Sequence, residues 1–235
     1  MKFRYQIFAF SFILISLLLP LTIIFPCEPY DPIFMKLEDK SKSDVSFMEF
    51  KSRLQKAIKE KDVKFINSIT SNDISFAFEE GGFGKKAFLK SWNLDKNPKT
   101  SNFWETLSQT INLGFNFKDE LWTAPYLFNS YPESVDPYSQ SLIIGNTVNI
   151  RDKPSAKGKI LTQLSWEFVK NEYEENPATQ NKMPGEPCRW QKVCLSDGQT
   201  GYICEQFLRS PFEYRVGFQK TNNKYMMIFF TTGSD

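Results

Sequence analysis

Four cysteines are the residues of this chain best suited to covalent chemistry. Cys188, Cys194 and Cys204 lie close together, and Cys27 lies far from them in the sequence. Their spacing lacks the C-x2-C pair that is typical of zinc sites, and the chain contains no His. In an oxidising compartment such cysteines form disulfides. We therefore expect one disulfide among the three and no metal site. Both a Cys194–Cys204 bridge and a bridge from Cys188 fit, and the remaining thiol is unassigned.

The absence of His removes much of the usual catalytic chemistry. It excludes Ser-His-Asp and Cys-His nucleophilic sites and His-ligated metals. Carboxylates remain, and two of them held at a fixed separation in a cleft could cleave a glycosidic bond. The acids that could serve are Glu79, Glu80, Glu105, Asp119 and Glu120. Because almost any set of acidic residues could be listed in this way, the list is weak evidence for an active site. We therefore expect no enzyme and no cofactor, and a carboxylate-based hydrolase is the less favoured alternative.

Aromatic side chains are the other candidates for a functional role, since the chain has 23 Phe, 9 Tyr and 5 Trp. Four of them, Trp166, Trp190, Tyr202 and Phe207, fall on strands or on the closing turn of a predicted all-β segment. Aromatic rings on such segments can line grooves that receive extended peptides or glycans. We take these four as candidate ligand-binding residues. The alternative is that they pack against a neighbouring unit.

The N-terminus carries an uncharged, strongly apolar stretch at residues 7–25. Lys2 and Arg4 precede it, which places the N-terminus in the cytoplasm and the rest of the chain outside. Residues 1–26 are therefore expected to be a signal peptide or a membrane anchor, and Cys27 could also follow a lipoprotein signal. Without Lys2 and Arg4 the basic residues equal the 27 acidic ones in number. A neutral exported chain argues against a nucleic-acid partner.

Helical periodicity dominates the segment after a predicted tether at residues 27–45. Ser46 and Glu49 have capping-box spacing at the start of a helix that reaches about Glu60. The apolar residues of this helix recur at helical spacing and predict its buried face; they are Phe47, Phe50, Leu54, Ala57 and Ile58. Asp62 is a plausible cap for a second helix, and further helices are expected over residues 85–93 and after Ser101. A short strand around residues 74–78 and β-like runs after Gly114 complete a predicted α+β unit over residues 46–141.

From residue 142 onward the pattern changes to short strands separated by turns. Strand-like runs lie at residues 159–170, 190–195 and 200–204, and Val148 and Ile150 alternate across a further strand before them. Val148, Ile150, Arg151, Pro154 and Ser155 in the first stretch, and Trp190, Lys192, Val193, Asp197, Gly198, Gly201 and Tyr202 in the second, form an ordered series. On this series, residues 142–209 resemble the bacterial Src-homology-3-like (SH3-like) domain of exported envelope proteins. The resemblance implies a small all-β barrel, with Trp190 and Tyr202 at two of its aromatic positions.

The C-terminal residues predict a β-hairpin with one buried face. Tyr214, Val216 and Phe218 alternate, as do Met226, Ile228 and Phe230, on either side of an asparagine turn. The segments flanking residues 142–209 resemble the cone-shaped nuclear-transport-factor-2-like α+β fold. That resemblance implies that residues 210–235 complete the sheet of residues 46–141. The alternative is that the hairpin packs on the barrel.

These observations favour an exported, non-enzymatic protein of the periplasm or cell surface. We expect it to bind a cell-wall peptide or glycan, or an extended protein segment, and to contact the membrane through residues 7–25. The alternative is a structural envelope-assembly protein in which the SH3-like unit is an intramolecular brace.

Overall fold

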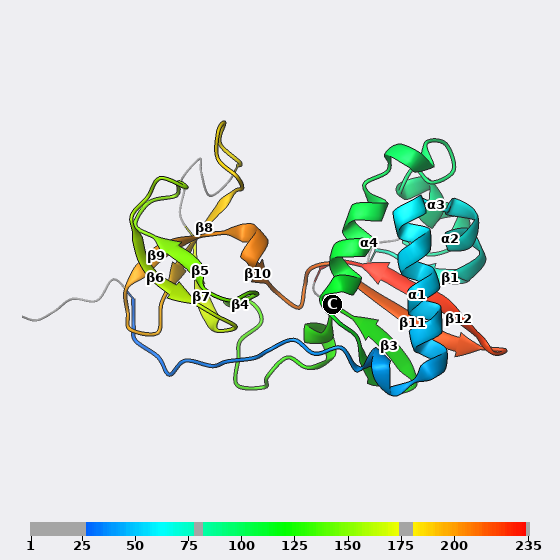
Figure 1. Ribbon diagram of the computed structural model, residues 1–235, viewed down its shortest axis with the longest axis horizontal. Helices are drawn as coiled ribbons and strands as arrows, with labels where there is room; N and C mark the ends of the chain where they lie inside the picture. The colour runs from blue at the N-terminus through cyan, green and yellow to red at the C-terminus, as the bar shows by residue number, and fades with distance from the viewer. Residues whose placement is uncertain (1–26, 78–81, 174–180, 234–235) are drawn as a thin grey trace, which may run out of the picture.

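The computed structural model describes residues 27–77, 82–173 and 181–233 of the chain, which form a mixed α+β structure with two sheets (Figure 1). The predicted signal or anchor segment at 7–25 lies outside the described residues, as do Phe78, Glu79 and Glu80. Within the described ranges, none of the helices combines the length and apolar character that a membrane crossing requires.

Four α-helices form the first unit. They are α1 (Val45–Glu60), α2 (Val63–Ile69), α3 (Lys85–Ser91) and α4 (Phe103–Asn112), with short 3-10 turns η1 (Lys40–Ser43), η2 (Pro98–Thr100) and η3 (Tyr126–Asn129).

Side-chain caps explain where α1 and α2 begin. The prediction that Ser46 caps α1 is wrong, because Asp44 occupies the cap position and its carboxylate accepts a hydrogen bond from the Phe47 N–H. Asp62 caps α2 as predicted, accepting from the Lys64 and Phe65 N–H groups. This two-residue shift of the cap leaves the buried stripe of α1, formed by Phe47, Phe50 and Leu54, unchanged.

A five-stranded sheet lies under these helices. Its strands, in spatial order, are β1 (Thr70–Ser75), β12 (Lys224–Thr231), β11 (Arg215–Thr221), β3 (Leu121–Ala124) and β2 (Asn116–Lys118). β1 runs parallel to β12, and the other neighbours are antiparallel. The C-terminal hairpin therefore sits between β1 and β3, beside strands from the N-terminal part of the chain, and not on the second sheet.

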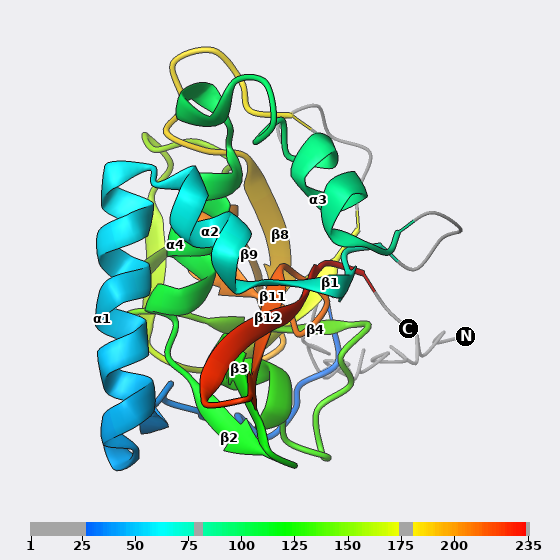
Figure 2. The same cartoon turned by 90° about the vertical axis from the view of Figure 1, so that its right-hand side faces the viewer.

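Helices α1 and α4 cover one face of this sheet and bury an aromatic core (Figure 2). Phe47 is fully buried, and its ring stacks on Trp122 of β3 with 4.1 Å between centroids. Phe50 and Leu54 continue the same stripe along α1. The helical spacing in the sequence thus correctly predicted which face of α1 is buried.

Seven strands form the second sheet. Their spatial order is β10 (Leu208–Arg209), β4 (Gln140–Ile143), β7 (Phe168–Glu172), β8 (Trp190–Cys194), β9 (Thr200–Cys204), β5 (Val148–Arg151) and β6 (Ile160–Leu164), and η4 (Glu205–Phe207) precedes β10.

This sheet is rolled but is not the closed barrel that we expected. Leu208 of β10 and Val148 of β5, which are far apart in the strand order, share one buried cluster, so the sheet curves around its core. No pairing between its outermost strands closes it in the described part of the chain. The run at 159–170 is also two strands instead of one, because Trp166 between them takes a left-handed φ of 56°.

The segment predicted as a tether packs along both units, and we call residues 27–40 the strap (Figure 1). On the second sheet, the Met35 N–H donates to the Trp166 carbonyl and the Phe168 N–H donates to the Ile33 carbonyl. On the first sheet, the Lys40 N–H donates to the Phe115 carbonyl at 2.9 Å. Apolar strap side chains also pack on a cluster that includes Leu142 and Phe168. The strap therefore links the two units by hydrogen bonds and buried contacts.

Candidate functional site

The disulfides confirm the prediction in part, because one bridge forms among the three clustered cysteines, from Cys188 to Cys204. Two bridges join all four cysteines, Cys27 to Cys194 and Cys188 to Cys204, so no thiol is unassigned and the Cys194–Cys204 bridge does not form. The register explains this, because Cys204 lies opposite Trp190 and Cys194 lies opposite Thr200, at the other end of the β8–β9 ladder. The Cys27 sulfur is bonded to Cys194 and is therefore not available for a lipid. Two disulfides indicate an oxidising, extracellular-type environment.

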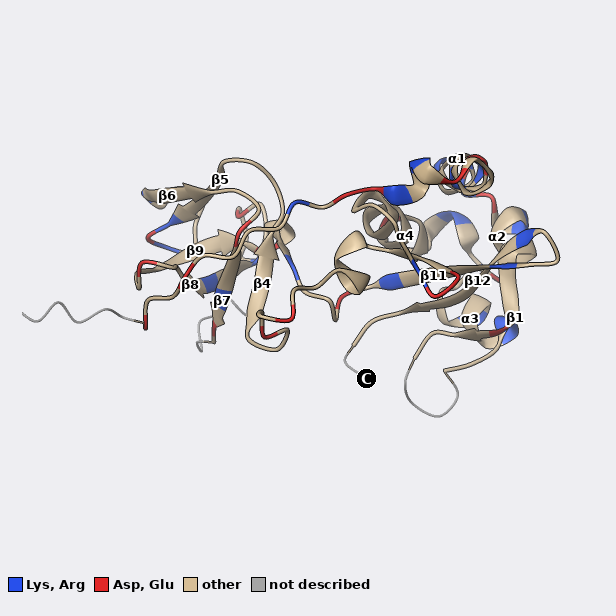
Figure 3. Cartoon of the chain, turned by 90° about the horizontal axis from the view of Figure 1, so that it is seen from below, with Lys and Arg blue, Asp and Glu red and all other residues tan. Residues whose placement is uncertain are grey.

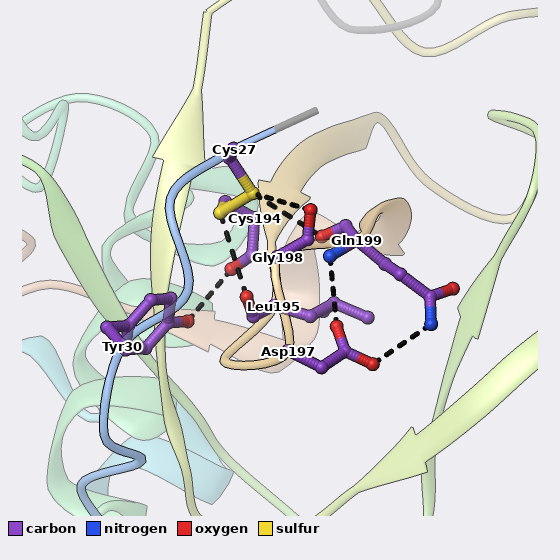
Figure 4. Close-up of a disulfide and its surroundings, with 7 residues drawn as sticks. All are labelled: Cys27, Tyr30, Cys194, Leu195, Asp197, Gly198 and Gln199. Carbon is purple, nitrogen blue, oxygen red and sulfur yellow. Dashed lines mark hydrogen bonds between the residues drawn. A yellow bond between two sulfur atoms is a disulfide. The ribbon is translucent and has the colours of Figure 1, made fainter. Parts of the chain in front are cut away.

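The Cys27–Cys194 bridge fixes the beginning of the strap to the end of β8 (Figure 4). Beside it, the Tyr30 hydroxyl donates to the Cys194 carbonyl at 2.9 Å, and the Tyr30 N–H donates to the Ser196 carbonyl. Burial raises the pKa of Tyr30 to about 12, so the phenol stays neutral and remains a hydrogen-bond donor at physiological pH. The Cys27 N–H also donates to the Gly198 carbonyl at 3.3 Å, so this end of the strap is held by a covalent bond and by several hydrogen bonds.

Trp190 and Tyr202 come together as expected, but Trp190 does not lie at an open surface. Only 3% of Trp190 is exposed, because its ring packs with Tyr202 and the Cys188–Cys204 disulfide. Its indole N–H donates to the Glu186 carboxylate at 3.1 Å. These contacts lie within the second unit and not against residues 46–141. Trp190 therefore acts as part of a small outer cluster of the second sheet.

The other two aromatic candidates lie elsewhere. The Trp166 indole N–H donates to Asn146 at 2.9 Å, at the junction between β6 and β7. Phe207 lies in η4 and is 36% exposed. The four aromatic residues therefore do not form one continuous surface.

The face of the second sheet opposite to Trp190 carries polar residues at positions where apolar residues would be expected. Directly opposite residues of an antiparallel pair share a face. Gln191 pairs with Ile203, Asn171 pairs with Val193, and Ser141 pairs with Val169. Val169, Val193 and Ile203 belong to the buried core. The inner face of the rolled sheet is thus apolar over most of its length and polar at one end.

At this polar end the sheet opens into a cavity of about 480 Å³, which we call the mouth groove. Ser141, Asn171 and Gln191 line it together with Tyr173, which is 83% exposed. Gln109 of α4 also lines it, so the groove lies where the two units meet. The mouth of a rolled sheet is a common place for a ligand.

Hydrogen bonds and ion pairs position the lining residues. The Asn171 amide donates to the Ser141 hydroxyl at 3.0 Å, and the Gln191 amide donates to the Glu172 carbonyl at 3.0 Å. Two ion pairs, Arg189–Glu205 and Arg209–Glu213, also border the groove. Burial raises the pKa of Glu213, although Arg209 opposes that shift. The groove therefore offers amides and hydroxyls with balanced charges.

The groove could have been predicted from the sequence by strand alternation. Asn171 and Gln191 occupy inward positions in strands whose other inward residues are apolar. This departure from the apolar pattern indicates an opening that is lined by polar side chains. The aromatic residues of the sequence predict a site on the opposite face of β8 instead. The remaining carboxylate candidates are dispersed, with Glu105 on α4 and both Asp119 and Glu120 in the turn between β2 and β3.

Metal and nucleic-acid sites find no support in the described part of the chain. Its Cys, Asp and Glu residues include no group of three or more that could hold a metal ion. Along the ribbon of both units, positions of Lys and Arg alternate with positions of Asp and Glu (Figure 3). Comparison of the chain with protein-family models, curated proteins and solved structures gave no match. The function proposed for this chain is therefore inferred from the geometry of the site.

Proposed function

We propose that this chain is a non-enzymatic binding protein of the cell envelope whose SH3-like unit holds a cell-wall peptide or glycan, or an extended protein segment, in the mouth groove. The observation that carries the proposal is the placement of Ser141, Asn171 and Gln191 on the inner face of the sheet, at its open end. Polar residues at core-facing positions lose packing energy, so their presence is best explained by contact with a polar ligand.

The chemistry of the groove favours a ligand rich in amides and hydroxyls. Asn and Gln side chains both donate and accept hydrogen bonds, which matches peptide groups and sugar hydroxyls. The exposed ring of Tyr173 adds a flat surface for an apolar face of the ligand. Because Arg189 and Arg209 are paired with glutamates, the groove has little excess charge for an anionic polymer.

A pull-down with purified peptidoglycan tests this proposal. We expect the Asn171→Ala/Gln191→Ala variant to lose most of the retention seen with the wild-type chain. The matched control is Asn149→Ala/Gln163→Ala, which removes a hydrogen-bonded Asn–Gln pair of the same unit on β5 and β6, outside the groove. Equal retention of both variants would overturn the proposed site.

The alternative, a structural protein in which the second unit is a brace, has one specific observation in its favour. The strap residues Ile33, Met35 and Leu37 pack on a cluster that includes Leu127 and Phe168, so the two units share buried apolar contacts. If bracing is the main role, the Asn171→Ala/Gln191→Ala variant will be retained on peptidoglycan to the same extent as the wild-type chain. Substitutions in the strap will instead lower the stability of the protein.

A further inference from the structure

A second pair of cavities lies in the first unit, away from the mouth groove. The start of α1, the β2–β3 turn and the β11–β12 turn gather at one end of the five-stranded sheet (Figure 2). Two cavities of about 480 and 460 Å³ meet there. Both are lined by Lys220, Asn223 and Tyr225, so they adjoin one another.

The first of these cavities is aromatic, and its two acids, Asp44 and Glu120, outnumber its one base, Lys220. The rings of Phe117, Trp122 and Tyr225 line it, together with the carboxylates of Asp44 and Glu120. Phe117 is 49% exposed, and its ring lies 4.8 Å from that of Trp122. The hydrogen bond from the Phe47 N–H holds the pKa of Asp44 below its usual range, so this group is charged. Aromatic faces beside carboxylates are the surroundings that bind an ammonium group.

The second cavity is basic. Arg53, Lys220 and Lys224 line it, against the single acid Glu49. Ser46 and Ser68 also line it, and the Ser68 hydroxyl donates to the Phe65 carbonyl. Guanidinium, ammonium and hydroxyl donors together suit a carboxylate, which accepts several hydrogen bonds at once.

A hydrogen-bonded network fixes the boundary between the two cavities. The Tyr225 hydroxyl donates to the Asp44 carboxylate at 3.2 Å and lies 2.8 Å from the Ser46 hydroxyl oxygen. The Lys220 ammonium donates to Ser46 and lies 5.3 Å from the centre of the Tyr225 ring. Tyr225 is only 7% exposed, so these contacts hold a buried ring in place. The separation of an acidic and a basic cavity is therefore built into the folded structure.

We propose that this cavity pair binds a short peptide with free ends, its N-terminal ammonium in the acidic aromatic cavity and its C-terminal carboxylate in the basic one. Each charge meets side chains of opposite sign, which a neutral glycan or an anionic polymer would not use. This site is independent of the mouth groove, so an experiment can disprove one of the two proposed sites without affecting the other.

Calorimetric titration of the full chain with trialanine, N-acetyl-trialanine and trialanine amide tests this inference. We expect each blocked peptide to bind about tenfold more weakly than the peptide with free ends, a loss of about 1.4 kcal/mol. Equal binding of all three peptides, or no binding of any, would overturn the proposal.

Variants assign each peptide end to its cavity. Glu120→Gln should remove the preference for a free amino group but keep the preference for a free carboxylate, and Arg53→Gln should do the reverse. Lys56→Gln, on the same helix as Arg53 but outside both cavities, is the control and should keep both preferences. If Glu120→Gln and Arg53→Gln weaken all three peptides equally, the assignment of the two ends is wrong.

Discussion

The two units of the molecule are stabilised by different means. Among the described residues, the first unit buries a single cluster of 21 apolar residues that includes nine Phe and Trp side chains, among them Phe47, Phe103 and Trp122. The second buries eight apolar residues in its main cluster, none of them aromatic. Both disulfides join cysteines of the second unit or attach the strap to it. A sheet with a small core thus depends on covalent links, whereas the larger core does not.

Removing the disulfides gives the largest expected effect on this comparison. The chain-entropy argument gives about 5 kcal/mol for a long closed loop and about 3 kcal/mol for a loop of about 15 residues. The sequence separations are 167 for Cys27–Cys194 and 16 for Cys188–Cys204. We expect Cys27→Ser/Cys194→Ser to lower the free energy of unfolding by more than Cys188→Ser/Cys204→Ser, as measured in urea.

Hydrogen exchange tells where the disulfide loss acts. In Cys27→Ser/Cys194→Ser, the Tyr30 and Met35 N–H groups, which bond to the second unit, should lose protection before the strands of the first sheet do. Equal loss throughout the chain would show that the two units unfold together and would break the comparison.

Truncating a side chain in the aromatic core should lower the free energy of unfolding by nearly as much as removing a disulfide. Phe47→Ala removes a fully buried ring that stacks on Trp122, and we expect the free energy of unfolding to fall by about 4 kcal/mol. Hydrogen exchange should show the loss in β3 and β11 but not in β8 and β9. Phe34→Ala is the control, because Phe34 is 64% exposed and its loss should change the free energy little.

A buried carboxylate under the strap gives a smaller, pH-dependent effect. Glu167 is 4% exposed, and its Oε1 has no hydrogen-bond partner. Burial raises the pKa of Glu167, with nearby Asp197 acting in the same direction and a hydrogen bond with Ser196 opposing it. A raised folded-state pKa favours folding below the unfolded-state pKa of about 4.3, and this contribution is lost as the pH rises through the folded-state value.

The Glu167→Gln substitution should therefore stabilise the protein more at pH 8 than at pH 4. We expect a gain of about 1 kcal/mol at the higher pH, because the uncompensated buried charge is removed. Thermal unfolding at the two pH values measures it, with the exposed Glu133→Gln as control. An equal effect of Glu167→Gln at both pH values would show that the carboxylate does not titrate differently in the folded state.

The smallest expected effect concerns the turn of the C-terminal hairpin. Asn222 and Asn223 both have left-handed φ angles, 50° and 60°, as a two-residue hairpin turn requires. Glycine adopts that conformation without steric cost, so Asn223→Gly should raise the free energy of unfolding by about 0.5 kcal/mol. A decrease, measured in urea, would indicate that the Asn223 side chain makes contacts that outweigh backbone strain.

The sequence predicted the parts of the fold that depend on local patterns. The stripe of Phe47, Phe50 and Leu54 identified the buried face of α1, and Asp62 identified the start of α2, because both signals arise within one or two turns of helix. The alternation of Val216 and Phe218 identified the C-terminal hairpin for the same reason.

The missed features depend on register between distant segments. The strap is held mainly by backbone hydrogen bonds, which leave little pattern in side-chain types, so residues 27–45 were expected to be a tether. The disulfides could not be assigned without knowing that Cys204 faces Trp190 across β8 and β9. The mouth groove was missed because aromatic content drew attention to Trp190, on the outer face of the strand whose inner face carries Gln191.

The Cys27–Cys194 bridge also determines how the protein would carry a mechanical load. A pull applied to the chain before Cys27 passes through the sulfur atoms directly into β8, which lies between β7 and β9 in the second sheet. The hydrogen bonds of the strap are bypassed, and the helices that follow the strap in the chain lie outside this path. The bridge therefore places the load on an interior strand, the same strand that carries Gln191 of the mouth groove.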